Sequence, residues 1–203
     1  SYTVTYNHNY TGSTNTSKTA TYTFKNWNTV AGGTGTSYAN SASVTNLTTT
    51  NGATVNLYAQ WNSASTSYTP TRTGYTFGGW YLDSACTGTR VDSSGTYTPT
   101  ANITLYAKWT LSQFQVTYDY ATNGGTSATK TSAMVDYGAS IDLSPTATKT
   151  GWTFVGWNTN KDATSKLSSL TMGTSQVTLY AVYKKTGQVT FNLNGNASFT
   201  YNN

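Results

Sequence analysis

The chain has 203 residues, of which 8% are charged and 14% are aromatic, and its formal net charge is +5. Soluble domains usually contain about 25% charged residues. In this chain, hydroxyl and amide side chains must therefore replace charged side chains over most of the solvent-exposed surface. The aromatic content argues against a disordered chain. The eleven cations are scattered, which argues against a nucleic-acid footprint, and no apolar run is long enough to span a membrane.

The predicted elements are strands. Glutamate is absent, no window has the apolar spacing of a helix, and alternation of apolar with polar residues is common. The first predicted strand is a Val-Thr-aromatic run at 4–6, and the same run opens later segments at 116–118 and 189–191. Asn-Gly turns follow the later two, at 123–124 and 194–195.

A longer phrase recurs three times between these opening strands. It consists of an aromatic-Thr-Phe strand, a tryptophan three residues after the phenylalanine, and a later Leu-Tyr-Ala strand that ends near another aromatic residue. Tandem recurrence of one unit predicts an array of small modules that share a core pattern. The residues predicted to form this core are Phe24, Trp27, Leu57 and Trp61, then Phe77, Trp80, Leu105 and Trp109, then Phe154, Trp157 and Leu179.

The tryptophan of each aromatic-Thr-Phe strand has the wrong parity for a regular strand. Three residues separate it from the phenylalanine, so strict alternation would point the two rings to opposite faces. One extra residue at a β-bulge would return the tryptophan to the face of the phenylalanine. The residue before each tryptophan is of a type that tolerates positive φ. We therefore predict a bulge or kink at Asn26, Gly79 and Gly156.

The copies are uneven in their opening strands. The predicted boundaries are 1–62 for the first repeat, 63–110 for a shortened second repeat without an opening strand, and 111–185 for the third. Residues 186–203 are a strand-like tail or the start of a fourth repeat. An unpaired sheet edge is a template for another strand. We expect the tail to complete a sheet in this chain or a neighbouring copy, with Val189, Phe191 and Leu193 as the donor residues.

The third and second copies carry family motifs. Residues 69–81 read TPTRTGYTFGGWY and 104–109 read TLYAKW, while 123–126 and 135–138 read NGGT and VDYG. These motifs resemble the Listeria–Bacteroides repeat, the B-repeat of internalin B. The resemblance implies a mainly β fold of tandem, small β-grasp-like modules in an elongated array. It also implies a place in surface proteins of bacteria and some archaea, as stalks or adhesive spacers. The first copy departs from the motif, with Lys25-Asn26 before its tryptophan.

Residues that could carry catalysis are sparse. His8 is the only histidine and lies far from any serine in an elbow-like turn, and Cys86 is the only cysteine. The six aspartates follow no repeated placement, and turn-capping explains those in loops better than calcium binding. We therefore expect no enzyme activity, no cofactor and no metal.

The predicted function is a non-enzymatic, extracellular segment of a cell-surface stalk, adhesin or filament that associates with itself by strand addition. A host or cell-surface glycan or protein is a further candidate partner. The alternative is a carbohydrate-binding module whose platforms are the repeated tyrosines Tyr58, Tyr106 and Tyr180. Packing of these tyrosines against a loop or an adjoining module is the favoured interpretation, and solvent-facing strand positions are a third. The start at Ser1 suggests a segment of a larger protein. Glycosylation sequons lie at Asn9, Asn15, Asn46, Asn102 and Asn196.

Overall fold

The computed structural model describes residues 1–92, 96–192 and 198–202, and its regular elements within these ranges are β-strands. The mainly β prediction is confirmed, while a β-grasp-like topology stays a prediction. The chain divides into two compact units, residues 1–71 with 77–109 (unit 1) and residues 72–76 with 110–203 (unit 2). Among the described residues, no helix is long and apolar enough to cross a bilayer.

The strands up to the end of unit 1 are β1 (Tyr2–Asn7), β2 (Thr16–Ala20), β3 (Thr23–Asn28), β4 (Ser37–Tyr38), β5 (Tyr58–Asn62), β6 (Thr66–Ser67), β7 (Tyr75–Tyr81), β8 (Arg90–Asp92), β9 (Thr96–Tyr97) and β10 (Ile103–Leu111). Those that follow are β11 (Gln113–Asp119), β12 (Ser127–Ala128), β13 (Ser132–Asp136), β14 (Ala147–Thr148), β15 (Thr153–Asn158), β16 (Val177–Lys184), β17 (Gln188–Asn192) and β18 (Ser198–Asn202).

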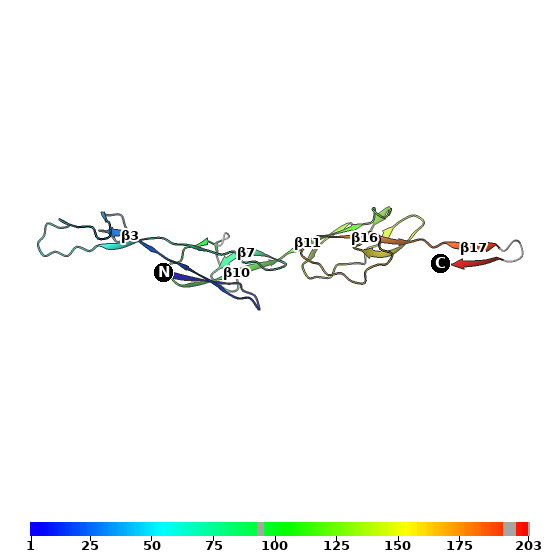
Figure 1. Ribbon diagram of the computed structural model, residues 1–203, viewed down its shortest axis with the longest axis horizontal. Helices are drawn as coiled ribbons and strands as arrows, with labels where there is room; N and C mark the ends of the chain where they lie inside the picture. The colour runs from blue at the N-terminus through cyan, green and yellow to red at the C-terminus, as the bar shows by residue number, and fades with distance from the viewer. Residues whose placement is uncertain (93–95, 193–197, 203) are drawn as a thin grey trace. The chain divides into compact units, whose positions relative to one another are not determined.

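The first strand of the chain completes the sheet of the second copy. β1 lies parallel to β10 in a five-stranded sheet of order β2-β1-β10-β7-β8 (Figure 1). Val4 is opposite Ile103 and Tyr6 is opposite Leu105. The second repeat, residues 63–110, contains no opening strand in its own sequence, and residues 2–7 provide one. β7 is the strand of this sheet that follows β2 along the chain. The strands β3–β5, which form another sheet, lie between them in the sequence.

The third copy has the same arrangement with its own opening strand. β11 lies parallel to β16 in a four-stranded sheet of order β13-β11-β16-β15. Val116 is opposite Val177 and Tyr118 is opposite Leu179, the same register as β1 on β10. We call β1 and β11 opening strands, and we call these two sheets the complete sheets.

The first copy is left with a sheet that has no opening strand. β3 pairs with β4 and β5 in a three-stranded sheet of order β4-β3-β5. We call residues 21–62 the open body. The third Val-Thr-aromatic run lies in β17, which pairs with β18 in a separate two-stranded sheet. We call the strands of a repeat other than its opening strand its body. Within the described residues, β17 is therefore an opening strand without a body, and the open body lacks an opening strand.

The bulges predicted at Asn26 and Gly156 are confirmed, and the backbone at Gly79 has a positive φ. The pairing of β3 with β5 shifts register between Phe24 and Asn26, and that of β15 with β16 shifts between Phe154 and Gly156. Gly156 has φ +147° and Gly79 has φ +110°, a region that favours glycine. In all three copies the tryptophan lies against its phenylalanine, with ring centroids 5.2–5.4 Å apart.

The complete sheets each have a hydrophobic core. One contains Val4, Tyr6, Trp80, Leu105 and Ala107, with Phe77 and Trp109 packed against it. The other contains Val116, Tyr118, Trp157, Leu179 and Ala181, with Phe154 packed against it. In the open body the core expected around Trp27 and Trp61 is not closed, because no opening strand covers it. Trp27 is 36% exposed and Trp61 is 56% exposed.

Candidate functional site: the open body

In each complete sheet, the opening strand supplies a tyrosine that covers the core tryptophan. The ring of Tyr6 lies 4.8 Å from that of Trp80, and the ring of Tyr118 lies 5.2 Å from that of Trp157. Both tryptophans are almost completely buried, with 0% and 1% exposure. Burial of an aromatic side chain of this size is a major contribution to a small core.

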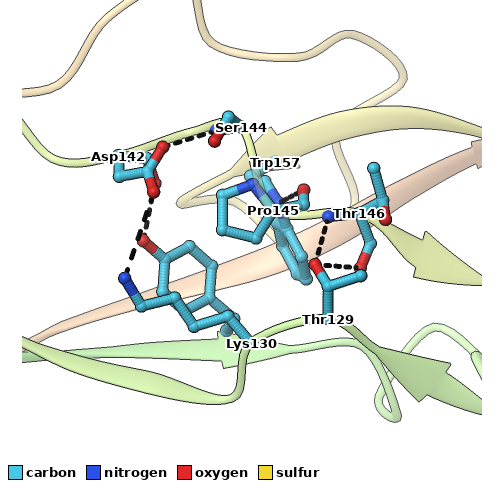
Figure 2. Close-up of polar contacts among 8 residues, drawn as sticks. Thr129, Lys130, Asp142, Ser144, Pro145, Thr146 and Trp157 are labelled. Carbon is cyan, nitrogen blue, oxygen red and sulfur yellow. Dashed lines mark hydrogen bonds and ion pairs between the residues drawn. The ribbon is translucent and has the colours of Figure 1, made fainter.

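The polar atoms of these buried rings have partners. The Tyr118 hydroxyl donates to the Asp142 carbonyl over 2.6 Å, and burial, then the Asp142 charge, raises the pKa of Tyr118. Figure 2 shows the Trp157 indole N–H donating to the Pro145 carbonyl over 2.6 Å. In the other complete sheet, the hydroxyl groups of Tyr6 and Thr66 lie 2.6 Å apart. An opening-strand tyrosine therefore needs a polar partner in its body.

The open body has the same core strands as the complete sheets. Trp27 is opposite Ala59 across β3 and β5, as Trp157 is opposite Ala181 across β15 and β16. However, β5 begins at Tyr58, whereas β10 begins at Ile103 and β16 at Val177. In the alignment of the Leu-Tyr-Ala strands, β5 is therefore three residues shorter at its start. The missing residues 55–57 are the equivalents of residues that pair with an opening strand in the complete sheets.

The apolar side chains on this side of the open body are exposed. Val55 is 37% exposed and Tyr58 is 41% exposed, and Leu57 is half-buried where Leu105 and Leu179 are fully buried. A groove of about 370 Å³ lies beside Trp27 and Leu57. Trp27 is equivalent to Trp80, whose ring Tyr6 contacts, and Leu57 is equivalent to Leu105, which is opposite Tyr6. The other residues that line this groove are Tyr38, Ala39, Ser41, Ala42 and Val44.

The loop side of the open body is well ordered by hydrogen bonds. The Asn28 side chain is fully buried; its Oδ1 accepts from the backbone N–H groups of Val30 and Gly35, and its Nδ2 donates to Ser37 Oγ. A buried amide with this many partners fixes the loop that follows β3. The loop after β3 is therefore held in place, while Val55 and Leu57, which align with residues that face an opening strand in the complete sheets, are exposed and half-buried, respectively.

The remaining predicted site residues lie in several places. Tyr58 is exposed in β5, while Tyr106 in β10 and Tyr180 in β16 are half-buried. Val189 and Phe191 belong to β17, and Leu193 lies outside the described residues. Of the sequons, Asn196 also lies outside them.

The side chains considered for catalysis take part in packing. His8 stacks on Tyr68 with ring centroids 5.5 Å apart, and its carbonyl accepts a hydrogen bond from Trp109. Cys86 is a buried free thiol. Burial, reinforced by the nearby Asp83 charge, raises its pKa, so it stays protonated at neutral pH. Within the part of the chain that the structure describes, no three His, Cys, Asp or Glu side chains form a metal-binding group.

Part of the groove carries no signal in the amino-acid sequence. Tyr38 and Val44 lie in a stretch rich in Ser, Ala and Asn without strand or helix periodicity, so no sequence signal pointed to them. Val55 does have a sequence signal, because it aligns with Ile103 and Val177 on the apolar face of the Leu-Tyr-Ala strands.

Comparison with known proteins identifies the repeats. The family described as the Listeria-Bacteroides repeat domain matches residues 48–108 and 114–182. Internalin H of Listeria monocytogenes is 35% identical over 118 residues, which are 57% of this chain and 20% of that protein. A Gly-rich membrane protein of Evansella cellulosilytica is 32% identical over 143 residues, 61% of this chain and 16% of that protein.

A second membrane protein of the same Evansella species is 33% identical over 117 residues, 55% of this chain and 17% of that protein. The chain therefore spans about a fifth or less of the length of these relatives. No solved structure matches the chain.

Proposed function

Because this chain belongs to the Listeria-Bacteroides repeat domain family, we propose that it is a non-catalytic structural segment of a cell-surface protein that lies outside the cell. The observation that carries the proposal is the repetition of one aromatic core. Trp80 and Trp157 occupy equivalent buried positions, each beneath an opening-strand tyrosine. Repetition of a packing unit is typical of proteins that act as spacers or scaffolds.

The side chains with chemical reactivity support a structural role. His8 and Cys86 are both engaged in packing, and the Cys86 thiol has a raised pKa, which is the opposite of what a nucleophilic cysteine needs. Relatives named as membrane proteins support a location at the cell surface. An elongated array of modules and contact with other cells stay predictions.

Self-association by strand addition is the finer part of the proposal. An unpaired strand edge next to exposed apolar side chains favours pairing with a further strand. β5 is an edge strand of the open body, and residues 55–57, which precede it, place Leu57 beside Trp27. The partner of this segment would then be another repeat-containing chain.

A second candidate function is carbohydrate binding, which one feature of the structure favours. Tyr2, Tyr22 and Trp61 line an open groove of about 370 Å³. Exposed aromatic rings are suitable stacking surfaces for sugar rings. This groove is a better candidate than the repeated tyrosines, because Tyr106 and Tyr180 are half-buried.

Titration of the chain with soluble glycans, followed by tryptophan fluorescence, separates the two functions. The structural proposal predicts no saturable change, because Trp61 serves no ligand. A saturable change that Trp61→Ala abolishes, and that the control Trp152→Ala at an exposed site in unit 2 leaves intact, would establish carbohydrate binding and overturn the structural proposal.

A further inference from the structure

We propose that the open body binds the β17–β18 hairpin of a second copy of this chain, with β17 laid parallel to residues 55–58. This inference rests on the proposed structural function and names the partner and the site. Three observations support it: the sequence equivalence of β17 with the opening strands β1 and β11, the register of the complete sheets, and the apolar residues that line the groove.

The β17 sequence is equivalent to that of the opening strands. Val189-Thr-Phe-Asn192 aligns with Val4-Thr-Tyr-Asn7 and with Val116-Thr-Tyr-Asp119. β17 also pairs antiparallel with the strand that follows it, β18, as β1 pairs antiparallel with β2. In the described structure β17 has no body beside it. It is thus an opening strand with one edge available.

The complete sheets fix the register of the proposed contact. Val4 and Val116 are opposite the residues that align with Val55, and Tyr6 and Tyr118 are opposite those that align with Leu57. The same register places Val189 opposite Val55 and Phe191 opposite Leu57. Parallel pairing in this register would extend β5 back over residues 55–57, to the length that β10 and β16 have.

The groove matches the one difference between β17 and the other opening strands. Tyr6 and Tyr118 have hydroxyl groups, which lie against Thr66 Oγ1 and the Asp142 carbonyl. β17 has Phe191 instead, which needs no polar partner. The open groove beside Trp27 and Leu57 is lined in part by Ala42 and Val44. An apolar ring is therefore the side chain that this groove can bury at least cost.

Charge and connection also fit a second copy. Residues 21–62 contain Lys25 as their only charged residue, and residues 188–202 contain none. The contact would be apolar and insensitive to salt. Three residues, 185–187, join β16 to β17, so the hairpin reaches at most about 14 Å from its own sheet. β11 is parallel to β16, so the hairpin leaves this sheet at the end opposite to the one where the chain enters it from β10. This exit favours an open body from another molecule, and repetition of such a head-to-tail contact is open-ended.

Two full-length variants test the proposal by complementation. Phe191→Asp removes the donor ring, and Val55→Asp places a charge in the acceptor edge at a site that is already 37% exposed and outside β5. The matched controls are Thr190→Asp and Val30→Asp. Thr190 is on the same strand as Phe191, and its equivalent in β11, Thr117, is exposed. Val30 is a 45% exposed residue of the open body. Molar mass is measured by sedimentation across protein concentration, at low and high salt.

The proposal predicts a mass of the wild-type chain and of both controls that rises with concentration at either salt. Each test variant alone stays monomeric, and an equimolar mixture of the two forms dimers and nothing larger, because one donor and one acceptor remain. A wild-type chain that stays monomeric at every concentration overturns the proposal, as does a mixture that stays monomeric while the wild type assembles. If the test variants assemble like the wild type, self-association stands but this site is refuted.

Discussion

Replacement of Trp157 by alanine is expected to lower the free energy of unfolding of unit 2 by about 3–5 kcal/mol, the usual cost of truncating a buried tryptophan. Trp157 is 1% exposed, contacts Tyr118 and Phe154, and donates a hydrogen bond to Pro145 over 2.6 Å. The substitution leaves a cavity and an unpaired Pro145 carbonyl. Urea unfolding followed by far-UV circular dichroism measures the effect.

The matched substitution in the open body is Trp27→Ala. Trp27 has the same place in the repeat as Trp157 but is 36% exposed. In the described structure, the ring of Phe24 lies against it, and no opening-strand tyrosine does. Its truncation should cost clearly less than that of Trp157 in the monomeric chain. Equal losses for the two substitutions would mean that the core around Trp27 is closed, contrary to the structure.

Replacement of Tyr6 by alanine is expected to destabilise the five-stranded sheet of unit 1 and to leave the open body unchanged. Tyr6 is fully buried, its ring lies 4.8 Å from Trp80, and its hydroxyl lies 2.6 Å from that of Thr66. Loss of a buried aromatic side chain costs about 3–5 kcal/mol. Hydrogen exchange read by mass spectrometry should show faster exchange in β7 and β10 and none of this effect in β5.

Tyr6→Phe is the matched control, because it keeps the ring and removes only the hydroxyl. It should cost about 1–3 kcal/mol, since Thr66 Oγ1 would be left without this partner in a buried site. Faster exchange in β5 in place of β10 after Tyr6→Ala would contradict the pairing of β1 with the second copy. It would support instead a first repeat that ends at residue 62 and contains its own opening strand.

Much of the local structure could be predicted from the sequence because it depends on neighbours in the chain. Alternation of apolar and polar residues identifies the Leu-Tyr-Ala strands. The spacing between Phe154 and Trp157 predicts the bulge at Gly156, because only an extra residue brings the two rings to one face.

The choice of partner for each opening strand could not be predicted from the sequence. Val4-Thr-Tyr6 and Val116-Thr-Tyr118 have the same pattern, so either could cover any of the three bodies. Order along the chain favours the nearest body, yet β1 passes over β3–β5 and pairs with β10. The groove residue Tyr38 could not be predicted either, because the sequence of its loop has no periodicity. The buried Asn28 side chain holds this loop in place.

Amide hydrogen exchange at residues 55–57, compared with residues 103–105 and 177–179, tests the central claim that the open body lacks an opening strand. In the monomeric chain, we expect strong protection at the two later segments, which pair with β1 and β11, and fast exchange at 55–57. Protection should appear at 55–57 when the chain assembles. Equal protection of all three segments in the monomer would contradict the claim.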